Sequence, residues 1–280
     1  MAFWKRKSTQ QHTDSTPAQS GGESTQSAER EIRALFAPWR AQHERVAWRP
    51  IIAPGDETSS FFGGAPATSN SADWPMCVGC EEPMSFLLQL DLATLPDAMT
   101  VSTRSGMIQL FYCSTDDGMC ETWAPFNGTA EVRLITTPVP IAAPTGLALF
   151  AKKAIGAWDA EPDYPHPPEH GLLGMKRRYD FATKTVTVIS EAPPIQAIDL
   201  PSGAVEFIAA ASSGDKLGGW PHWIQGVEYP ACPDCGDAMA LFMQLDSHCG
   251  LEHNFGDNGC AHLTQCLAHP AQFAFGWACG

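Results

Sequence analysis

Short apolar or alternating runs of strand length follow one another along most of the chain. They span residues 46–53, 84–92, 107–112, 131–136, 183–190, 205–210 and 239–245. Glycine and proline interrupt the sequence between these runs and favour turns there. The pattern therefore predicts a mainly β protein of the α+β class.

One helical pattern precedes these strands, at residues 28–45, with Ser27 as its N-cap and Pro38 as a point where it could break. Four apolar side chains share one face of this helix, namely Ile32, Leu35, Phe36 and Trp39. We expect that face to pack on the β core. Residues 1–27 are rich in Ser, Thr and Gln without apolar periodicity, which predicts a disordered tail.

The sequence repeats itself at an offset of 155 positions. Ten of the thirty residues from 62 to 91 are identical to their counterparts, including a Gly-Gly-x-Pro, a Cys-x-x-Cys and a Gln-Leu-Asp motif. At a slightly shorter offset, Cys113 aligns with Cys266. Internal repetition of this kind indicates a duplicated structural unit. We therefore expect two pseudo-repeated β-sheet units, each carrying a zinc knuckle, which is a Cys-x-x-Cys turn at residues 77–80 in the first unit and 232–235 in the second.

The repeat also suggests domain boundaries. Residues 28–150 are expected to form the first unit with its leading helix, and residues 171–280 the second. Prolines are dense near the end of residues 151–170, which predicts a linker between the units.

Each Cys-x-x-Cys turn places two thiolates on one side of a tight loop, whereas a structural zinc site takes four nitrogen or sulfur ligands. In the first unit only two further cysteines remain to complete such a site. The first predicted site therefore consists of Cys77, Cys80, Cys113 and Cys120.

In the second unit, Cys266 corresponds to Cys113, and His269 follows it after two residues. The second predicted site consists of Cys232, Cys235, Cys266 and His269. Three other cysteines remain alternatives to His269 as the fourth ligand, namely Cys249, Cys260 and Cys279. The predicted cofactors are two structural Zn²⁺ ions.

Redox chemistry and disulfides are the competing interpretations of paired cysteines. A redox Cys-x-x-Cys motif normally opens a helix, whereas both pairs here lead into apolar β runs. The N-terminal sequence lacks the apolar segment of a secretory signal, so we expect a cytoplasmic location, where reducing conditions disfavour disulfides. Metal binding is therefore favoured.

The net charge of the chain limits the classes of molecule that it is expected to bind. The chain has 17 basic and 31 acidic side chains, giving a net charge of −14. Such a field repels nucleic acid and anionic lipid and attracts basic proteins. No apolar run has the roughly 18 residues of a membrane span. We expect a basic protein partner, no nucleic acid, no membrane and a monomeric state.

Motifs for catalysis are missing from the sequence. It contains no Gly-rich phosphate loop, no Gly-x-Ser-x-Gly elbow and no His-Glu-x-x-His helix, so no catalytic residue is assigned and a non-enzymatic role is expected. A metal-dependent hydrolase remains the alternative if water took the place of His269. The aromatic cluster at residues 220–223 suits either a recognition surface or internal packing.

Several of these motifs together resemble a known family. The Gly-Gly-x-Pro-x-Trp motif at residues 218–223, the two knuckles, the segment at 83–90 and the segment at 256–270 are similar to the YwqG-like bacterial family of unknown function. The second knuckle and residues 216–221 also resemble the eukaryotic programmed cell death protein 2 group.

This resemblance, over residues 55–280, implies a mostly β, pseudo-duplicated architecture. From the eukaryotic relatives it implies a dedicated chaperone of a small-subunit ribosomal protein, and bacterial members are linked to toxin–immunity gene neighbourhoods. Many bacterial relatives lack the cysteines, so the resemblance implies zinc only for the branch of the family that, like this chain, carries them. The expected function is a zinc-stabilised protein-binding module, chaperone-like or immunity-like toward a basic partner.

Overall fold

The computed structural model describes residues 20–55, 58–115, 120–191 and 194–280. Most of its strands belong to one large sheet. The first half of the chain supplies β1 (Arg45–Ile52), β2 (Phe61–Phe62), β4 (Ser85–Asp91), β5 (Met107–Tyr112) and β6 (Ala130–Ile135). The later part supplies β8 (Lys153–Asp163), β12 (Lys216–Gly218), β13 (Ala240–Asp246), β14 (Cys260–Gln265) and β15 (Phe273–Ala278).

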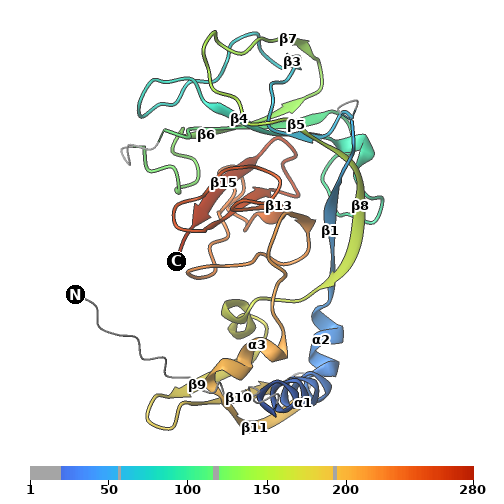
Figure 1. Cartoon of the computed structure of the whole chain (residues 1–280), viewed down its shortest axis with the longest axis vertical. Coiled ribbons are helices and arrows are strands. Elements are labelled where there is room, and N and C mark those ends of the chain that lie inside the picture. The colour runs from blue at the N-terminus through green and yellow to red at the C-terminus, as the bar shows by residue number, and fades with distance from the viewer. Residues whose placement is uncertain (1–19, 56–57, 116–119, 192–193) are drawn as a thin grey trace, which may run out of the picture.

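These ten strands lie in the order β15-β14-β13-β12-β1-β8-β2-β4-β5-β6, and every neighbouring pair is antiparallel. The two edge strands, β6 and β15, approach each other. Beside this seam the N–H of Trp277 donates to the carbonyl of Trp123 at 3.2 Å. The sheet is thus nearly closed around one apolar core, to which both halves contribute (Figure 1). The prediction of a mainly β protein is confirmed.

Equivalent features recur in the two halves at the offset of 155 residues. The strand β4 corresponds to β13, and both contain a bulge at the same place. The isolated bridge between Met76 and Pro83 corresponds to that between Ala231 and Ala238. The orders β2-β4-β5-β6 and β12-β13-β14-β15 are alike. Each half therefore presents its knuckle at the same position relative to its strands.

The segment 151–170 is not the linker that we expected. It contains β8, which lies between β1 and β2 in the middle of the sheet. In Figure 1, β1 and β8 run side by side along one flank of the molecule. Prolines are dense only from Pro162 onward, at the end of β8 and beyond it, and their density obscured the strand before them.

A smaller sheet lies at the other end of the molecule (Figure 1). Here β9 (Met175–Asp180), β10 (Thr185–Glu191) and β11 (Pro194–Pro201) form a three-stranded sheet in the order β11-β10-β9. The other short elements are β3 (Thr68–Ser69), β7 (Val139–Pro140), and the 3-10 turns η1 (Leu92–Thr94), η2 (Pro167–Gly171) and η3 (Ser202–Ala204). The strands β3 and β7 pair with each other.

The N-terminal helix differs from the prediction in its bounds and its packing. It consists of α1 (Ser20–Leu35) and α2 (Ala37–His43), which are separated at Phe36, and Pro38 lies in the first turn of α2. Residues 20–27 of the predicted tail are therefore helical, and residues 1–19 lie outside the described residues. Phe36 and Trp39 pack with Val186 and Val188 of the small sheet rather than on the main core.

The strand predicted at residues 205–210 is wrong, because this segment forms α3 (Val205–Ile208). Val205 and Ile208 are both buried, at the three-residue spacing that brings side chains to one face of a helix. So short an apolar run does not distinguish strand from helix by its pattern. No helix among the described residues is long and apolar enough to cross a membrane.

Candidate metal centres

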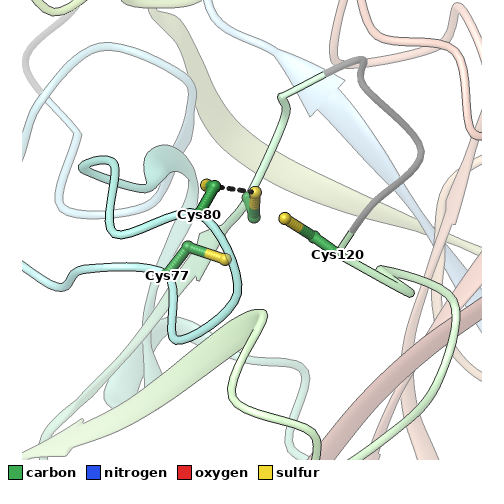
Figure 2. Close-up of side chains that lie close together, drawn as sticks. Cys77, Cys80 and Cys120 are labelled. Atoms are coloured by element: carbon green, nitrogen blue, oxygen red, sulfur yellow. Dashed lines mark hydrogen bonds between the residues drawn. The ribbon is translucent and has the colours of Figure 1, made fainter.

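The first knuckle is a tight loop that precedes β4. The N–H of Cys77 donates to the carbonyl of Glu82 at 2.9 Å, and the N–H of Glu81 donates to the carbonyl of Cys77 at 2.9 Å. The N–H of Gly79 points at the Cys77 sulfur at 3.3 Å. This backbone pattern turns the side chains of Cys77 and Cys80 to the same side (Figure 2).

The other two thiols of this site come from the far end of β5. Cys113 directly follows β5, and its N–H donates to the carbonyl of Thr129 at 2.8 Å. Figure 2 shows Cys120 approaching the knuckle from the opposite side. The Cys80 and Cys113 sulfurs lie 3.7 Å apart, and all four sulfurs lie within 4.8 Å of one another. This cluster could hold a metal ion.

The second knuckle has the same backbone pattern. The N–H of Cys232 donates to the carbonyl of Asp237, and the N–H of Gly236 donates to that of Cys232, both at 2.8 Å. Cys266 directly follows β14. The Cys235 and Cys266 sulfurs lie 3.8 Å apart. This pair is the counterpart of the Cys80 and Cys113 pair in the first site.

His269 completes the second cluster. Its Nδ1 lies 3.6 Å from the Cys232 sulfur and 3.5 Å from the Cys266 sulfur. Its carbonyl accepts a hydrogen bond from the N–H of Gln272, which closes the turn that positions the ring. All four ligand atoms of this cluster lie within 4.8 Å of one another.

The structure thus brings all eight predicted ligands together in two clusters. In the described part of the chain, no other group of three or more His, Cys, Asp or Glu side chains lies this close. The alternatives to His269 lie elsewhere: the Cys260 sulfur lies 3.7 Å from His262, and Cys249 and Cys279 belong to neither cluster. Which metal the clusters bind stays a prediction.

The protein environment favours ionisation of one thiol in each cluster. Hydrogen bonding from the backbone at Glu82 lowers the pKa of Cys80 to about 7, against the opposing effect of burial. Burial acts to raise the pKa of Cys232, but backbone N–H groups of the knuckle outweigh it and lower that pKa to about 7. Burial raises the pKa of Cys113. A bound cation would allow all the thiols of a cluster to ionise together.

Comparison with protein families assigns most of the chain to a family. Residues 60–264 match a family described as a domain of unknown function, DUF1963. The chain belongs to this family. No curated protein matches the chain. The DUF1963 region spans both knuckles and the strands from β2 to β14, whereas Cys266 and His269 lie just beyond its end. The resemblance to the YwqG-like and programmed cell death protein 2 groups stays a prediction.

Sequence analysis missed a cavity beside the second site. Its lining includes Trp223, Tyr229, His262 and Thr264, which come from the loop before the second knuckle and from β14. Both tryptophans of the cluster at residues 220–223 are buried, so the packing interpretation holds for them, and Trp223 also faces this cavity. Comparison of the two repeats position by position could have indicated the cavity.

The two knuckles differ at one strained backbone position. Glu81 has a φ of 61°, and its counterpart Gly236 has a φ of 79°. A left-handed conformation costs a non-glycine residue about 1 to 2 kcal/mol, part of which a glycine loses again in entropy. We therefore expect Glu81→Gly to raise the free energy of unfolding by about 0.5 to 1 kcal/mol, measured by denaturant titration of the metal-loaded protein.

The reverse change tests the same argument. A Cβ at Gly236 would meet no atom within 4 Å, so Gly236→Ala changes only backbone strain and should cost about 1 kcal/mol. Gly171→Ala is the matched control, because Gly171 also has open space and lacks a positive φ. Equal stabilities of the Gly236→Ala and Gly171→Ala variants would contradict the assignment of strain to this position.

Proposed function

We propose that the chain is a zinc-stabilised protein-binding module that captures a basic protein partner, in a chaperone-like or immunity-like role. The distances within the two clusters carry the metal assignment. Tetrahedral zinc with Zn–S bonds of about 2.3 Å and Zn–N bonds of about 2.05 Å requires S···S edges of about 3.8 Å and S···N edges of about 3.6 Å. The Cys80–Cys113 and Cys235–Cys266 sulfurs lie 3.7 and 3.8 Å apart, and His269 Nδ1 lies 3.6 and 3.5 Å from two sulfurs of its cluster, while all ligand atoms of each cluster lie within 4.8 Å of one another.

The same distances support zinc over the competing interpretations. A disulfide requires sulfurs about 2.05 Å apart, so neither S···S pair is close to one. Thiolate and imidazole ligands in a tetrahedron favour zinc among the common divalent ions. Four protein ligands fill a tetrahedron, whereas a catalytic zinc keeps an open position for water. We therefore propose two structural ions and a non-enzymatic chain.

The nature of the surface supports a protein partner. The net charge of −14 favours encounter with basic proteins and suppresses encounter with acidic ones. Large apolar side chains are exposed around the first knuckle, including Val78 at 74% and Phe126 at 53%. The N–H of Val78 donates to the carbonyl of Gly128, so the loop that carries Phe126 lies against the knuckle. Grouped exposed apolar side chains are typical of interaction sites.

Capture from the native cytosol tests this proposal. We expect the full chain to recover basic proteins, with yields that fall as salt rises, since charge steers the encounter. Val78→Ser combined with Phe126→Ser should reduce the yield while leaving the metal content unchanged. Phe181→Ser is the control, because Phe181 is 90% exposed in the turn that follows β9 of the small sheet. Recovery of acidic proteins only, or equal yields from all variants, would refute the proposal.

A further inference from the structure

A cavity of about 630 Å³ lies on the outer face of β14 and β15. Alternate residues of β14 point into the core, so His262 and Thr264 face the other way and line the cavity. Trp223 and Tyr229, from the loop that leads to the second knuckle, form the facing wall. A cavity of this size and lining suits a side chain or a small ligand.

The same place in the first half of the sheet is filled. Counting back from the cysteine that follows each strand, Phe111 of β5 corresponds to Thr264 of β14. The strand registers then place Arg133 of β6 where β15 has Gly276. Two large side chains in one half are thus replaced by a threonine and a glycine in the other. This loss of volume leaves a cavity over Thr264, whereas the segment with Trp123 occupies the space directly above Gly276, where an added Cβ would lie 2.9 Å from the Trp123 carbonyl oxygen.

In the first half the space holds a guanidinium group. Arg133 is only 7% exposed, and its Cζ lies 5.1 Å from the centroid of the Phe111 ring. Its Nη1 donates to the Ser69 hydroxyl at 3.0 Å, its Nη2 to the Asp73 carbonyl at 3.1 Å, and its Nε to the Glu131 carboxylate at 2.6 Å. The outer face of the sheet, with its covering loop, therefore forms a complete guanidinium site from its own residues.

We propose that the cavity beside the second metal site binds an arginine side chain of a protein partner, in the position that Arg133 occupies in the first half. This inference rests on the proposed function and specifies the side chain that is recognised. Among the described residues that line the cavity, Glu228 is the only Asp, Glu, Lys or Arg, and it occupies the loop position equivalent to Asp73. The charge of the lining thus complements a guanidinium.

The aromatic wall is fixed before any ligand arrives. Trp223 Nε1 donates to Glu169 Oε1 at 2.6 Å, and the Tyr229 hydroxyl donates to the same oxygen at 2.7 Å. The two rings meet edge to face, with centroids 5.0 Å apart. Burial raises the pKa of Glu169, and these two hydrogen bonds oppose the rise. Preorganised aromatic faces bind cations without a large ordering cost.

His262 does not add a positive charge to the wall. Burial lowers the pKa of His262 to about 3, so the imidazole is neutral at physiological pH. Its ring lies against Trp223 with centroids 4.6 Å apart. A guanidinium entering the cavity therefore meets aromatic rings, a hydroxyl and one carboxylate, and no competing cation among the described lining residues.

Titration with a capped amino acid tests the site. The probes are Nα-acetyl-arginine N-methylamide and its citrulline counterpart, which has nearly the same shape and no charge. We expect the arginine probe to shift the indole N–H signals of the metal-loaded full chain in a saturable way. The citrulline probe should bind about tenfold more weakly, since a desolvated cation–π contact contributes about 1 to 2 kcal/mol. Equal affinities for the two probes, or no saturable response, would overturn the assignment.

Variants locate the response in the cavity. Thr264→Phe places a ring where the first half has Phe111, whose centroid lies 5.1 Å from the Arg133 Cζ, and should strengthen binding of the arginine probe severalfold. Thr264→Val keeps the volume and should leave binding unchanged. Glu228→Gln should weaken binding severalfold, and because Glu228 is exposed this change does not threaten folding. Unchanged binding in both Thr264→Phe and Glu228→Gln would refute the inference.

Partner capture separates this inference from the proposed function. Capture of basic proteins together with no binding of the arginine probe would leave the proposed function standing and overturn the arginine site. Probe binding that responds to the changes at Thr264 and Glu228, without capture of any basic protein, would support the site and count against the proposed function.

Discussion

Replacing Cys232 and Cys235 together with serine is expected to lower the zinc content from two ions per chain to one and to open the second knuckle. The knuckle has little apolar packing of its own, since among the described residues its buried cluster contains only Cys232, Met239, Cys266 and Ala274. Zinc binding contributes on the order of 10 kcal/mol in small zinc modules and is coupled to their folding. Most of the local stability of this loop should therefore depend on the ion.

Elemental analysis of protein purified without a metal-binding tag measures the stoichiometry. Hydrogen exchange measures the opening, and we expect the N–H of Cys232 and the N–H of Gly236 to lose protection. Cys249→Ser is the control, because Cys249 is a free, exposed cysteine outside both clusters. Two zinc ions retained by the double variant, or knuckle cysteines found as disulfides in freshly lysed cells, would show that the metal assignment is wrong.

The first site should respond less strongly to the equivalent change. Its cysteines belong to a larger buried cluster that includes Trp74, Phe86 and Phe111. The indole of Trp74 also donates to the carbonyl of Met84 at 2.8 Å, which ties the loop before the knuckle to the start of β4. These contacts remain when the metal is lost. Comparing exchange in the two double cysteine variants therefore separates the contribution of zinc from that of apolar packing.

The metal clusters could be predicted from the sequence because local spacing specifies most of their geometry. A Cys-x-x-Cys turn places two thiols on one side whatever the rest of the chain does. The internal repeat then selected Cys113 and Cys266, and both directly follow equivalent strands. His269 could be proposed from its spacing to Cys266, but only the fold distinguishes it from the remaining cysteines.

The sheet order and the cavity could not be predicted in this way, since both depend on contacts between distant segments. The strand β8 pairs with β1 along its length, and no local sequence pattern predicts that pairing. The helix face with Phe36 and Trp39 is apolar, but its periodicity does not say which of two sheets it covers. Likewise, the sequence around Gly276 does not show that Arg133 is its counterpart in the other half, because only the strand registers establish that correspondence.

The segment mistaken for a linker holds the ion pair whose loss should have the largest effect outside the metal sites. The Asp163 carboxylate accepts hydrogen bonds from Lys216 Nζ at 2.7 Å, from the N–H of Trp220 at 2.8 Å and from the N–H of Ser212 at 2.8 Å. The side chains of Asp163 and Lys216 are both fully buried. This pair joins the end of β8 to β12 inside the molecule.

Asp163→Asn is therefore expected to cost about 3 to 5 kcal/mol of unfolding free energy, because it leaves the Lys216 ammonium buried without a counter-charge. Glu161→Gln is the matched control: its partner Arg49 lies 2.8 Å away, but that pair is partly exposed and should contribute less than about 1 kcal/mol. Adding Lys216→Met to Asp163→Asn should restore part of the stability, since no unpaired charge then remains buried.

The pH dependence of the stability of the Asp163→Asn variant provides an independent test of this explanation. Burial already lowers the pKa of Lys216, although Asp163 opposes this effect, so loss of the carboxylate lowers that pKa further. A lysine whose folded pKa lies below its unfolded value releases its proton first in the folded state, so stability rises with pH between the two values. Relative to the parent chain, the variant's deficit in unfolding free energy should shrink as pH rises toward about 10, near the unfolded pKa of lysine. A deficit that is constant with pH, or no larger than that of Glu161→Gln, would mean that the buried ammonium is not its cause.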